Sequence, residues 1–363
     1  MKKIWIPLIL ACLALTCLAA CGNPPQHVEG FAYESLGNGT CKLISKGGNN
    51  AYTLTVPDRS PQGERVVAIG AGVFRGAENL TRLTLPEGLE IIEENAFRDC
   101  ASLQSVTFPS TLREIGDGAF WGCADLFYVR LPKGLEKLGN GVFAYCSTIT
   151  NLSMEEGGEF FEGSSNCIIR KADKTVVAGG KRTVLIGGVE HIAPNAFRGM
   201  PLSETFTVPV GVVSIGEGAF FGVSTMKSIH LPASLTSIGE GAFGDNAALV
   251  SYTVSPSNTV YRSEGNAILT MDGKTLLFGC NATVIPEGVE KIGAGAFRAM
   301  KRLSAITLPA SIREIGSEAF CDCPFLETFT VNQTEDTFET VEKGKDWKAN
   351  SNFTVVYVAP AVE

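Results

Sequence analysis

A fixed spacing of phenylalanine constrains this chain more than any other feature of its sequence. Nine phenylalanines follow one another at intervals of 23 residues, with two intervals of 54: Phe74, Phe97, Phe120, Phe143, Phe197, Phe220, Phe243, Phe297 and Phe320. A constant period in the twenties indicates a solenoid, in which each turn packs only against its neighbours. The length of 363 residues alone would suggest about two compact domains, but the period overrides that expectation.

Other apolar residues keep the same register. Around Phe74, an apolar residue stands five positions before it, at Ile69, and six, nine and eleven positions after it, at Leu80, Leu83 and Leu85. Stacked turns bring equal positions together, so each column is expected to form a continuous core. The alternation around Leu83 predicts a short strand with one buried face. The Gly-x-x-Ala-Phe segment predicts a tight turn followed by a short helical or 3-10 turn.

The two intervals of 54 have a common explanation, namely one ordinary turn followed by a longer turn of 31 residues. In the second interval, Asp272-Gly273 lies between two apolar runs, and this pair favours a tight hairpin turn because glycine tolerates positive φ. A related segment, 166–177, stands 100 residues earlier. We therefore predict two β-hairpin insertions, at about 155–185 and 255–285.

The repeat unit resembles that of the BspA-like leucine-rich repeats common in bacterial surface proteins. The segment TFPSTLREIGDGAFWGC, residues 107–123, follows that pattern closely. The resemblance implies a β-rich, right-handed leucine-rich-repeat solenoid over 61–331, with a parallel sheet on one face. It also implies an N-terminal β cap over 31–60, a C-terminal cap over 332–363, and a surface role in adhesion or protein recognition.

The N-terminus has the features of an export signal. Lys2 and Lys3 precede an apolar run, so residues 1–20 are interpreted as a signal peptide. The sequence Leu-Ala-Ala-Cys-Gly ending at Gly22 resembles a bacterial lipobox. The resemblance implies cleavage before Cys21, lipid attachment at Cys21 and a polar tether over 21–30. The alternative is a cleaved signal that ends in an incidental cysteine. We expect an exported protein, lipid-anchored to the bacterial membrane and facing outward.

Two local motifs suggest chemistry but recur too often to carry it. Gly116-Asp117-Gly118 is similar to part of a nucleotide-binding loop, yet the same spacing of glycines returns in five other turns. A dinucleotide loop occurs once, between a strand and a helix, so these glycines are interpreted as turn residues. Cysteine stands three residues after several phenylalanines, as at Cys123, but alanine, valine and methionine occupy the same position elsewhere. The position therefore favours a small apolar side chain, and we expect free thiols there rather than a zinc site.

The remaining cysteines are less informative. Cys321 occupies a position that holds arginine or tryptophan in other turns, so we expect it to be exposed. Cys41, Cys167 and Cys280 lie in the expected cap and insertions. The sequence does not determine the redox state of these four cysteines.

The functional prediction is a non-enzymatic protein with no cofactor, metal or catalytic residue. The net charge is −8, or about −10 without Lys2 and Lys3, and no basic run is present, so nucleic acid is excluded as a partner. Positions eight and ten after each phenylalanine are expected to face solvent and are mostly serine and threonine. Arg82, Tyr128 and Arg130 depart from that background.

We predict that Arg82, Tyr128 and Arg130 contact a partner, because tyrosine and arginine are enriched at binding hot spots. The partner is expected to be a negatively charged protein, such as a host matrix protein or another surface protein. The membrane is expected to be a partner only through the lipid on Cys21. If the contact lies elsewhere, the two hairpin insertions are the next candidates. The alternative function is surface glycan binding in polysaccharide capture, which favours several exposed aromatic residues on one face.

Overall fold

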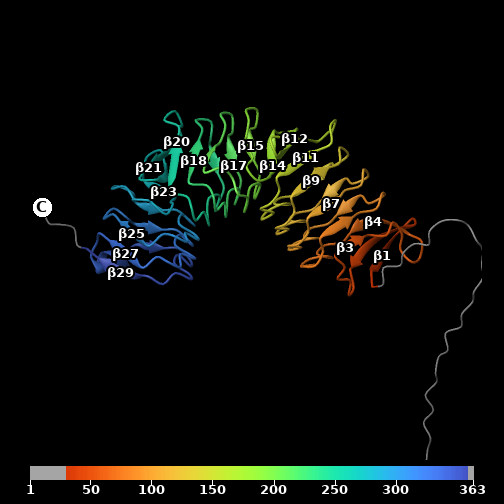
Figure 1. Ribbon diagram of the computed structural model, residues 1–363. Coiled ribbons are helices and arrows are strands. Elements are labelled where there is room, and N and C mark those ends of the chain that lie inside the picture. The colour runs from red at the N-terminus through yellow and green to blue at the C-terminus, as the bar shows by residue number, and fades with distance from the viewer. Residues whose placement is uncertain (1–29, 359–363) are drawn as a thin grey trace, which may run out of the picture.

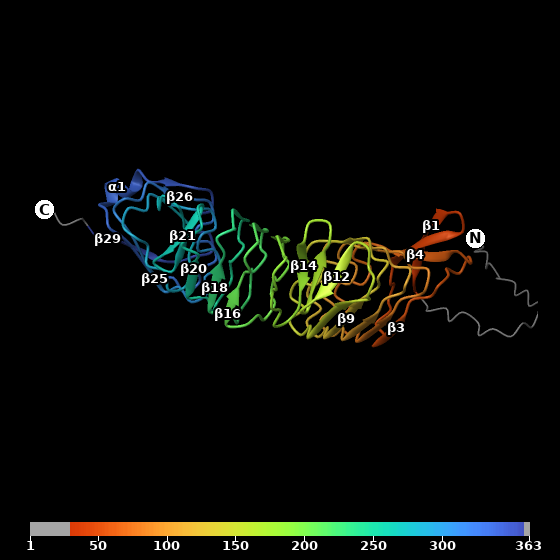
Figure 2. The same cartoon turned by 90° about the horizontal axis from the view of Figure 1, so that it is seen from above.

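The computed structural model describes residues 30–358. The chain winds into about 14 stacked turns of roughly 23 residues, with almost no helix. The turns form an arch with the two ends of the chain at opposite ends (Figure 1), and a view from above shows the same linear stack (Figure 2). The predicted leucine-rich-repeat solenoid is therefore confirmed.

Each ordinary turn contributes two strands, which belong to two separate parallel ladders. In one turn these are β9 (Tyr128–Leu131) and β10 (Lys137–Leu138). β9 lies beside β11 (Asn151–Met154) of the following turn, with residue 128 paired to 151 and 130 to 153. β10 pairs with β8 (Glu114–Ile115) of the preceding turn. The sequence predicted the first ladder; the second is formed by the isoleucine column.

The first ladder is divided into three sheets of longer strands, all parallel. The first consists of β3 (Thr53–Thr55), β5 (Arg82–Thr84), β7 (Ser105–Thr107), β9 and β11; the second of β16 (Thr205–Thr207), β18 (Ser228–Leu231) and β20 (Ser251–Val254); the third of β25 (Ala305–Leu308), β27 (Thr328–Val331) and β29 (Thr354–Tyr357). The two interruptions coincide with the two long intervals of the sequence.

The second ladder also forms three sheets, each of which begins with antiparallel strands. The first of these sheets consists of β1 (Ala32–Gly37), β2 (Thr40–Ser45), β4 (Arg65–Ile69), β6 (Ile91–Ile92), β8 and β10. The second consists of β12 (Phe161–Ser164), β13 (Cys167–Arg170), β14 (Thr175–Gly179), β15 (His191–Ile192), β17 (Ser214–Ile215) and β19 (Ser237–Ile238). The third consists of β21 (Tyr261–Glu264), β22 (Ala267–Thr270), β23 (Thr275–Phe278), β24 (Lys291–Ile292), β26 (Glu314–Ile315) and β28 (Glu342–Lys343). The one helix of residues 30–358, α1 (Glu335–Glu339), lies near the C-terminal end.

The hairpin insertions contain one strand more than the sequence predicted. β13 and β14 form the expected hairpin, as do β22 and β23, and Gly273 has the expected positive φ of 72°. An additional antiparallel strand, β12 or β21, precedes each hairpin. The last strand of each hairpin then pairs in parallel with the next ordinary turn, β14 with β15 and β23 with β24. Each insertion is therefore part of the solenoid rather than an appendage.

The segment around each phenylalanine is a chain of tight turns. The N–H groups of Trp121 and Cys123 donate to the carbonyls three residues earlier, of Gly118 and Phe120, at 2.9 and 3.2 Å. Between them, the N–H of Phe120 donates to the carbonyl of Val142 in the next turn, at 3.0 Å. Since every second N–H is used between turns, the predicted 3-10-like bonds form singly and do not extend into a helix.

The phenylalanine side chains stack along the solenoid axis. The ring centroids of Phe74 and Phe97 lie 4.9 Å apart with an angle of 5° between planes, and those of Phe97 and Phe120 lie 5.1 Å apart at 9°. Phe220 and Phe243 stack in the same way further along. All five rings are buried. The column predicted from the 23-residue period is therefore the centre of the core.

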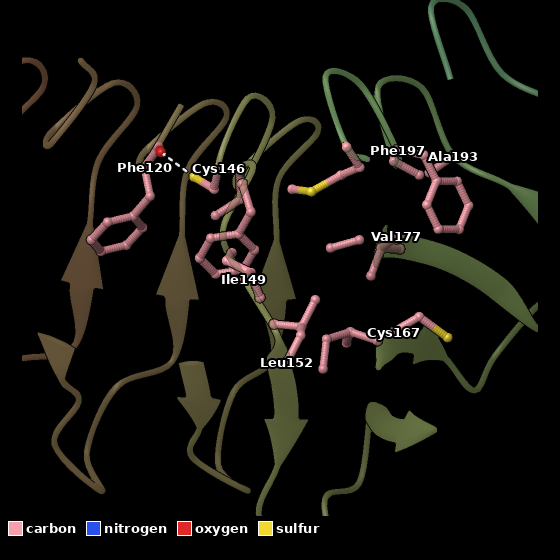
Figure 3. Packing of buried hydrophobic residues seen from close by; sticks show 14 of the residues in the cluster. Phe120, Cys146, Ile149, Leu152, Cys167, Val177, Ala193 and Phe197 are labelled. Atoms are coloured by element: carbon pink, nitrogen blue, oxygen red, sulfur yellow. Dashed lines mark hydrogen bonds between the residues drawn. The ribbon is translucent and has the colours of Figure 1, made fainter. Parts of the chain in front are cut away.

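The stack is interrupted at each insertion, where a glycine takes the backbone place of a phenylalanine. The N–H of Gly179 donates to the carbonyl of Ala196 at 2.9 Å, as the N–H of Phe74 does to Ala96. A Cβ at Gly179 would lie 2.0 Å from a ring carbon of Phe197. Glycine is required here because the Phe197 ring lies directly against the backbone. Figure 3 shows this junction, with Val177 and Ala193 near the ring.

Phe120→Ala tests the stacked core. Phe120 has a stacked neighbour on each side, and removal of a buried phenylalanine costs about 3–5 kcal/mol. Because each turn depends on its neighbours, we expect a large fall in Tm and loss of order in the adjoining turns, measured by thermal unfolding. Thr107→Ala is the control, since Thr107 is exposed on β7, and it should leave Tm nearly unchanged. Equal effects of the two substitutions would contradict the register described above.

Candidate binding surface

Two of the predicted contact residues stand side by side on strand β9. Burial alternates along this strand, with Val129 and Leu131 buried and Tyr128 and Arg130 exposed. The side chain of Tyr128 is 42% exposed. The alternation follows from the pleat of a strand that has only one buried face. Tyr128 and Arg130 therefore project together from the solvent face of the first sheet.

Arg82 lies in the same row on β5. The register pairs Arg82 with Ser105, and Ser105 with Tyr128, so two strand spacings of about 4.8 Å separate Arg82 from Tyr128. Within residues 30–358, neither Arg82 nor Arg130 forms a salt bridge. We refer to Arg82, Tyr128 and Arg130 as the strand-face patch.

The surroundings of the strand-face patch carry both charges. Tyr128 and Arg130 line a shallow groove together with five further residues: Lys133, Ser153, Met154, Glu155 and Glu156. The two glutamates come from the end of β11, and Glu155 accepts a hydrogen bond from the backbone N–H of Lys133 at 3.4 Å. The basic character expected from the sequence is thus limited to the side of the patch away from the glutamates.

A second aromatic residue, not predicted from the sequence, lies beside the patch. Phe127 immediately precedes Tyr128 and is 49% exposed. It stands seven residues after Phe120, one position before the strand residues that the sequence predicts to face solvent. Equivalent positions in adjoining turns hold Gln104 and Thr150. A search for apolar residues at polar positions of the repeat would have found Phe127.

The first insertion also contributes to the same face. Arg182 and Val184 are exposed, while the residues next to them, Thr183 and Leu185, are buried. The N–H of Lys181 donates to the carbonyl of Ile149 at 2.7 Å, which places this segment beside β11. The sequence contained a signal for this, because Leu185 precedes Ile192 by the same seven residues that separate Leu85 from Ile92.

A groove opens between β11 and this segment, and we call it the junction groove. Its lining residues are Thr150, Ser165, Asn166, Lys181, Arg182 and Val184. The Asn166 side chain spans the floor: it accepts from the N–H of Leu152 at 2.5 Å and donates to the carbonyl of Lys181 at 2.8 Å. A side-chain amide thus replaces the backbone rung that would otherwise join two strands.

An aromatic cluster connects the turns on either side of the same junction. The guanidinium of Arg198 lies 4.1 Å from the ring centroid of Phe221, 5.2 Å from Trp121 and 5.9 Å from Tyr145. Tyr145 adopts a φ of 59°, and its N–H donates to the carbonyl of Arg198 at 2.8 Å. Cation–π contacts of this kind stabilise neighbouring groups, so the cluster holds together turns that the insertion separates in sequence.

The eight cysteines of residues 30–358 are free, as expected for the column that follows each phenylalanine. The thiols of Cys100, Cys123 and Cys146 donate to the carbonyl of the phenylalanine one turn earlier, at 3.0 to 3.2 Å; Figure 3 shows the bond from Cys146 to Phe120. A partner for the thiol is therefore supplied by the backbone of each preceding turn.

The prediction that Cys321 is exposed is wrong, because only 7% of it is accessible. The C-terminal end of the chain runs alongside, with the N–H groups of Phe320 and Asp322 donating to the carbonyls of Trp347 and Ala349. The long side chains that occupy this position in other turns reach solvent; the short side chain of Cys321 does not.

Among residues 30–358, no group of three or more His, Cys, Asp or Glu side chains is arranged to hold a metal ion. In the same range, no helix is long and apolar enough to cross a bilayer. Cys21 and the predicted signal peptide lie outside the described residues.

The fold and the repeats define a leucine-rich-repeat solenoid protein. More specifically, the chain belongs to the BspA-type leucine-rich-repeat family: the model of the BspA type leucine-rich repeat region matches residues 67–170, 189–265 and 278–356 in six copies, which is more than half of the chain. No catalytic family is indicated. A comparison with curated protein sequences gives no significant match.

Several solved structures are similar to this chain at low sequence identity. A leucine-rich repeat protein from Eubacterium ventriosum is 18% identical, with a TM-score of 0.42 over 92% of this chain and 72% of that one. A leucine-rich cell surface protein from Faecalibacterium prausnitzii is 19% identical, with a TM-score of 0.39 over 89% and 99%. The pneumococcal vaccine antigen PcpA is 13% identical, with a TM-score of 0.37 over 90% and 85%.

Burial of the thiols predicts that they resist alkylation while the protein is folded. Burial raises the pKa of the Cys323 thiol to about 11, and burial together with the charge of Glu162 raises that of Cys167 to about 12. Because the thiolate is the nucleophile, both groups stay protonated and unreactive at neutral pH. Mass spectrometry after iodoacetamide treatment should find Cys167 and Cys323 unmodified in the native protein and modified in denaturant. Modification of Cys167 or Cys323 in the native protein as fast as that of a solvent-exposed cysteine would contradict this packing.

Proposed function

We propose that this chain is a non-enzymatic cell-surface protein that binds a protein partner through the solvent face of its longer strands, in adhesion or recognition. The observation that carries the proposal is that Tyr128 and Arg130 are both exposed, two residues apart on the same face of β9. Both side chains project from a rigid strand, and most equivalent positions hold serine or threonine. Aromatic and arginine side chains in such a setting are typical of binding hot spots.

The charges around the strand-face patch suggest how the partner is oriented. Arg82 and Arg130 are exposed and free of salt bridges among residues 30–358, whereas Glu155 and Glu156 border the other side of the groove. Complementary charge favours a partner whose carboxylates lie over the arginines and away from the glutamates. The overall negative charge of the chain would repel acidic partners elsewhere and so confine them to this region.

Glycan binding remains a second candidate because Phe127 and Tyr128 are adjacent and both exposed. A sugar ring has an apolar face that can stack on an exposed aromatic ring. A glycan array and a binding assay with host matrix proteins distinguish the class of ligand, and the double variant described next tests both candidates.

The Tyr128→Ala/Arg130→Ala double variant should lose most of the partner affinity. Truncation of one hot-spot residue costs about 2 kcal/mol, or about 30-fold in Kd. Thr205→Ala/Thr207→Ala is the matched control, because these residues occupy the same two positions on β16. Binding is measured by surface plasmon resonance with a ligand identified in the array or the matrix-protein assay. Unchanged affinity in a normally folded double variant would exclude the strand-face patch as the contact.

The outward-facing location is proposed from the lipobox-like sequence that ends in Cys21 and Gly22. Cys21→Ala should remove the site of lipid attachment, so the protein should leave the membrane fraction or accumulate unprocessed. Fractionation of expressing bacteria followed by immunoblotting measures both effects. A variant that stays in the membrane and is processed normally would contradict the lipid anchor.

A further inference from the structure

We propose that the junction groove binds carboxylate groups of an acidic protein segment. The inference builds on the proposed function, since it names the chemistry of a protein partner, but it concerns different residues. The groove lies beside β11, which also borders the strand-face patch. A partner lying along this face would therefore meet the patch and the groove in succession.

The first observation is the presence of two cations without an ionic partner. Lys181 and Arg182 line the groove, and neither forms a salt bridge within residues 30–358. By contrast, Lys174 is paired with Glu190 and Lys227 with Glu204. In an acidic protein that pairs many of its cations, two adjacent unpaired ones favour an anionic ligand.

The second insertion provides an internal comparison, because it repeats the first at a distance of 100 residues. The positions that correspond to the lining residues hold Val250, Gly265, Asn266, Asn281, Ala282 and Val284. Both cations and both hydroxyl groups are therefore missing from the second copy. Asn281 instead donates to the carbonyls of Asn246, Ala247 and Leu249 at 3.1 to 3.2 Å, a purely structural role.

The backbone also differs between the two copies: it closes the gap in the second copy and leaves it open in the first. In the second copy, the N–H of Val284 donates to the carbonyl of Gly265 at 2.9 Å and closes the gap. A Cβ at Gly265 would lie 1.9 Å from the carbonyl oxygen of Val284. The first copy carries Ser165 at this position, and no corresponding bond joins residues 184 and 165 in the described part of the chain. The serine side chain is thus incompatible with closure, and the first groove stays open.

The backbone at Arg182 adopts an unfavourable conformation that the second copy lacks. Arg182 has a φ of 58°, a region that residues other than glycine seldom adopt. Ser165 also has a positive φ, of 48°, but it shares this with Gly265 of the second copy, at 56°. Ala282, the counterpart of Arg182, is not among the residues with positive φ. Such outliers tend to persist where a binding site needs them, and here the outlier carries one of the two cations.

The lining chemistry fits an extended acidic segment of protein. A guanidinium binds a carboxylate through two parallel hydrogen bonds, and the hydroxyl of Ser165 is a further donor in the same groove. The hydroxyl of Thr150 already donates to the carbonyl of Phe127 at 3.3 Å. Val184 is 64% exposed and lies two residues after Arg182. This spacing matches an extended chain that carries an acidic and an apolar side chain two residues apart, on one face. No lining residue is aromatic, so the groove lacks the platform that favours a sugar ring.

The test uses the full-length chain and a fluorescent peptide that repeats Glu-Ser-Val-Ser, so that glutamate and valine lie on one face when the peptide is extended. Binding is followed by anisotropy at two salt concentrations. The key variant is Lys181→Asn/Arg182→Ala, which installs the residues of the second copy. The matched control is Arg302→Ala/Lys345→Asn, which removes the same two charges from exposed positions elsewhere. A peptide with serine in place of glutamate and a sulfated polysaccharide serve as alternative probes.

We expect the acidic peptide to bind, with affinity that falls as salt rises. The key variant should bind it about tenfold more weakly or worse, and the control variant as well as the wild type. Absence of peptide binding, or equal binding by the key variant, would overturn the proposal. Tighter binding of the polysaccharide through the same two residues would overturn the assignment to protein. The two proposals can fail separately. Unchanged partner affinity in the Tyr128→Ala/Arg130→Ala variant would exclude the strand-face patch, but it would not alter the result of the peptide assay on the junction groove.

Discussion

The stacking of phenylalanine rings along the axis is the interaction on which the rest of the structure depends. Neighbouring rings lie 4.9 to 5.8 Å apart and nearly parallel within each block. A ring can stack on the next only if the chain returns to the same place after a fixed number of residues, so the period of 23 is a packing requirement. The N–H of seven of the nine phenylalanines, all but Phe143 and Phe243, also bonds to the next turn, which couples side-chain packing to backbone register. Stability is therefore shared between adjacent turns, as in other solenoids.

The same requirement explains why the junction groove lies at the first insertion. Within a block, successive turns follow the same backbone path, and most exposed strand positions hold serine or threonine. An insertion removes a phenylalanine, and Gly179 lets the Phe197 ring pack against the backbone instead. The sheet of longer strands is interrupted there, and the Asn166 side chain bridges the interruption. The backbone that follows the second hairpin strand forms no strand, and it presents Lys181 and Arg182 in the junction groove.

Much of the fold could be predicted because its determinants are local and repeated. The period identified the phenylalanine core, Asp272-Gly273 indicated a hairpin, and the tolerance of alanine and methionine at the cysteine position predicted free thiols. The second ladder was harder to predict, since a two-residue strand such as β8 is too short to show alternation. Tyr145 and Arg198 could not be paired from sequence, because their contact passes over a whole insertion. Cys321 was misjudged because its burial depends on the C-terminal end of the chain, which does not follow the repeat.

Native-state hydrogen exchange tests most directly whether the stacked phenylalanines hold the solenoid together. If they do, the amides of Phe97, Phe120 and Phe220 should be among the slowest to exchange, since each bonds to the following turn inside the core. Amides within one block should open together, in a cooperative unit bounded by the insertions. Exchange at these phenylalanines as rapid as at exposed loop residues such as Gly187 would contradict the account, because it would place the source of stability outside the stack.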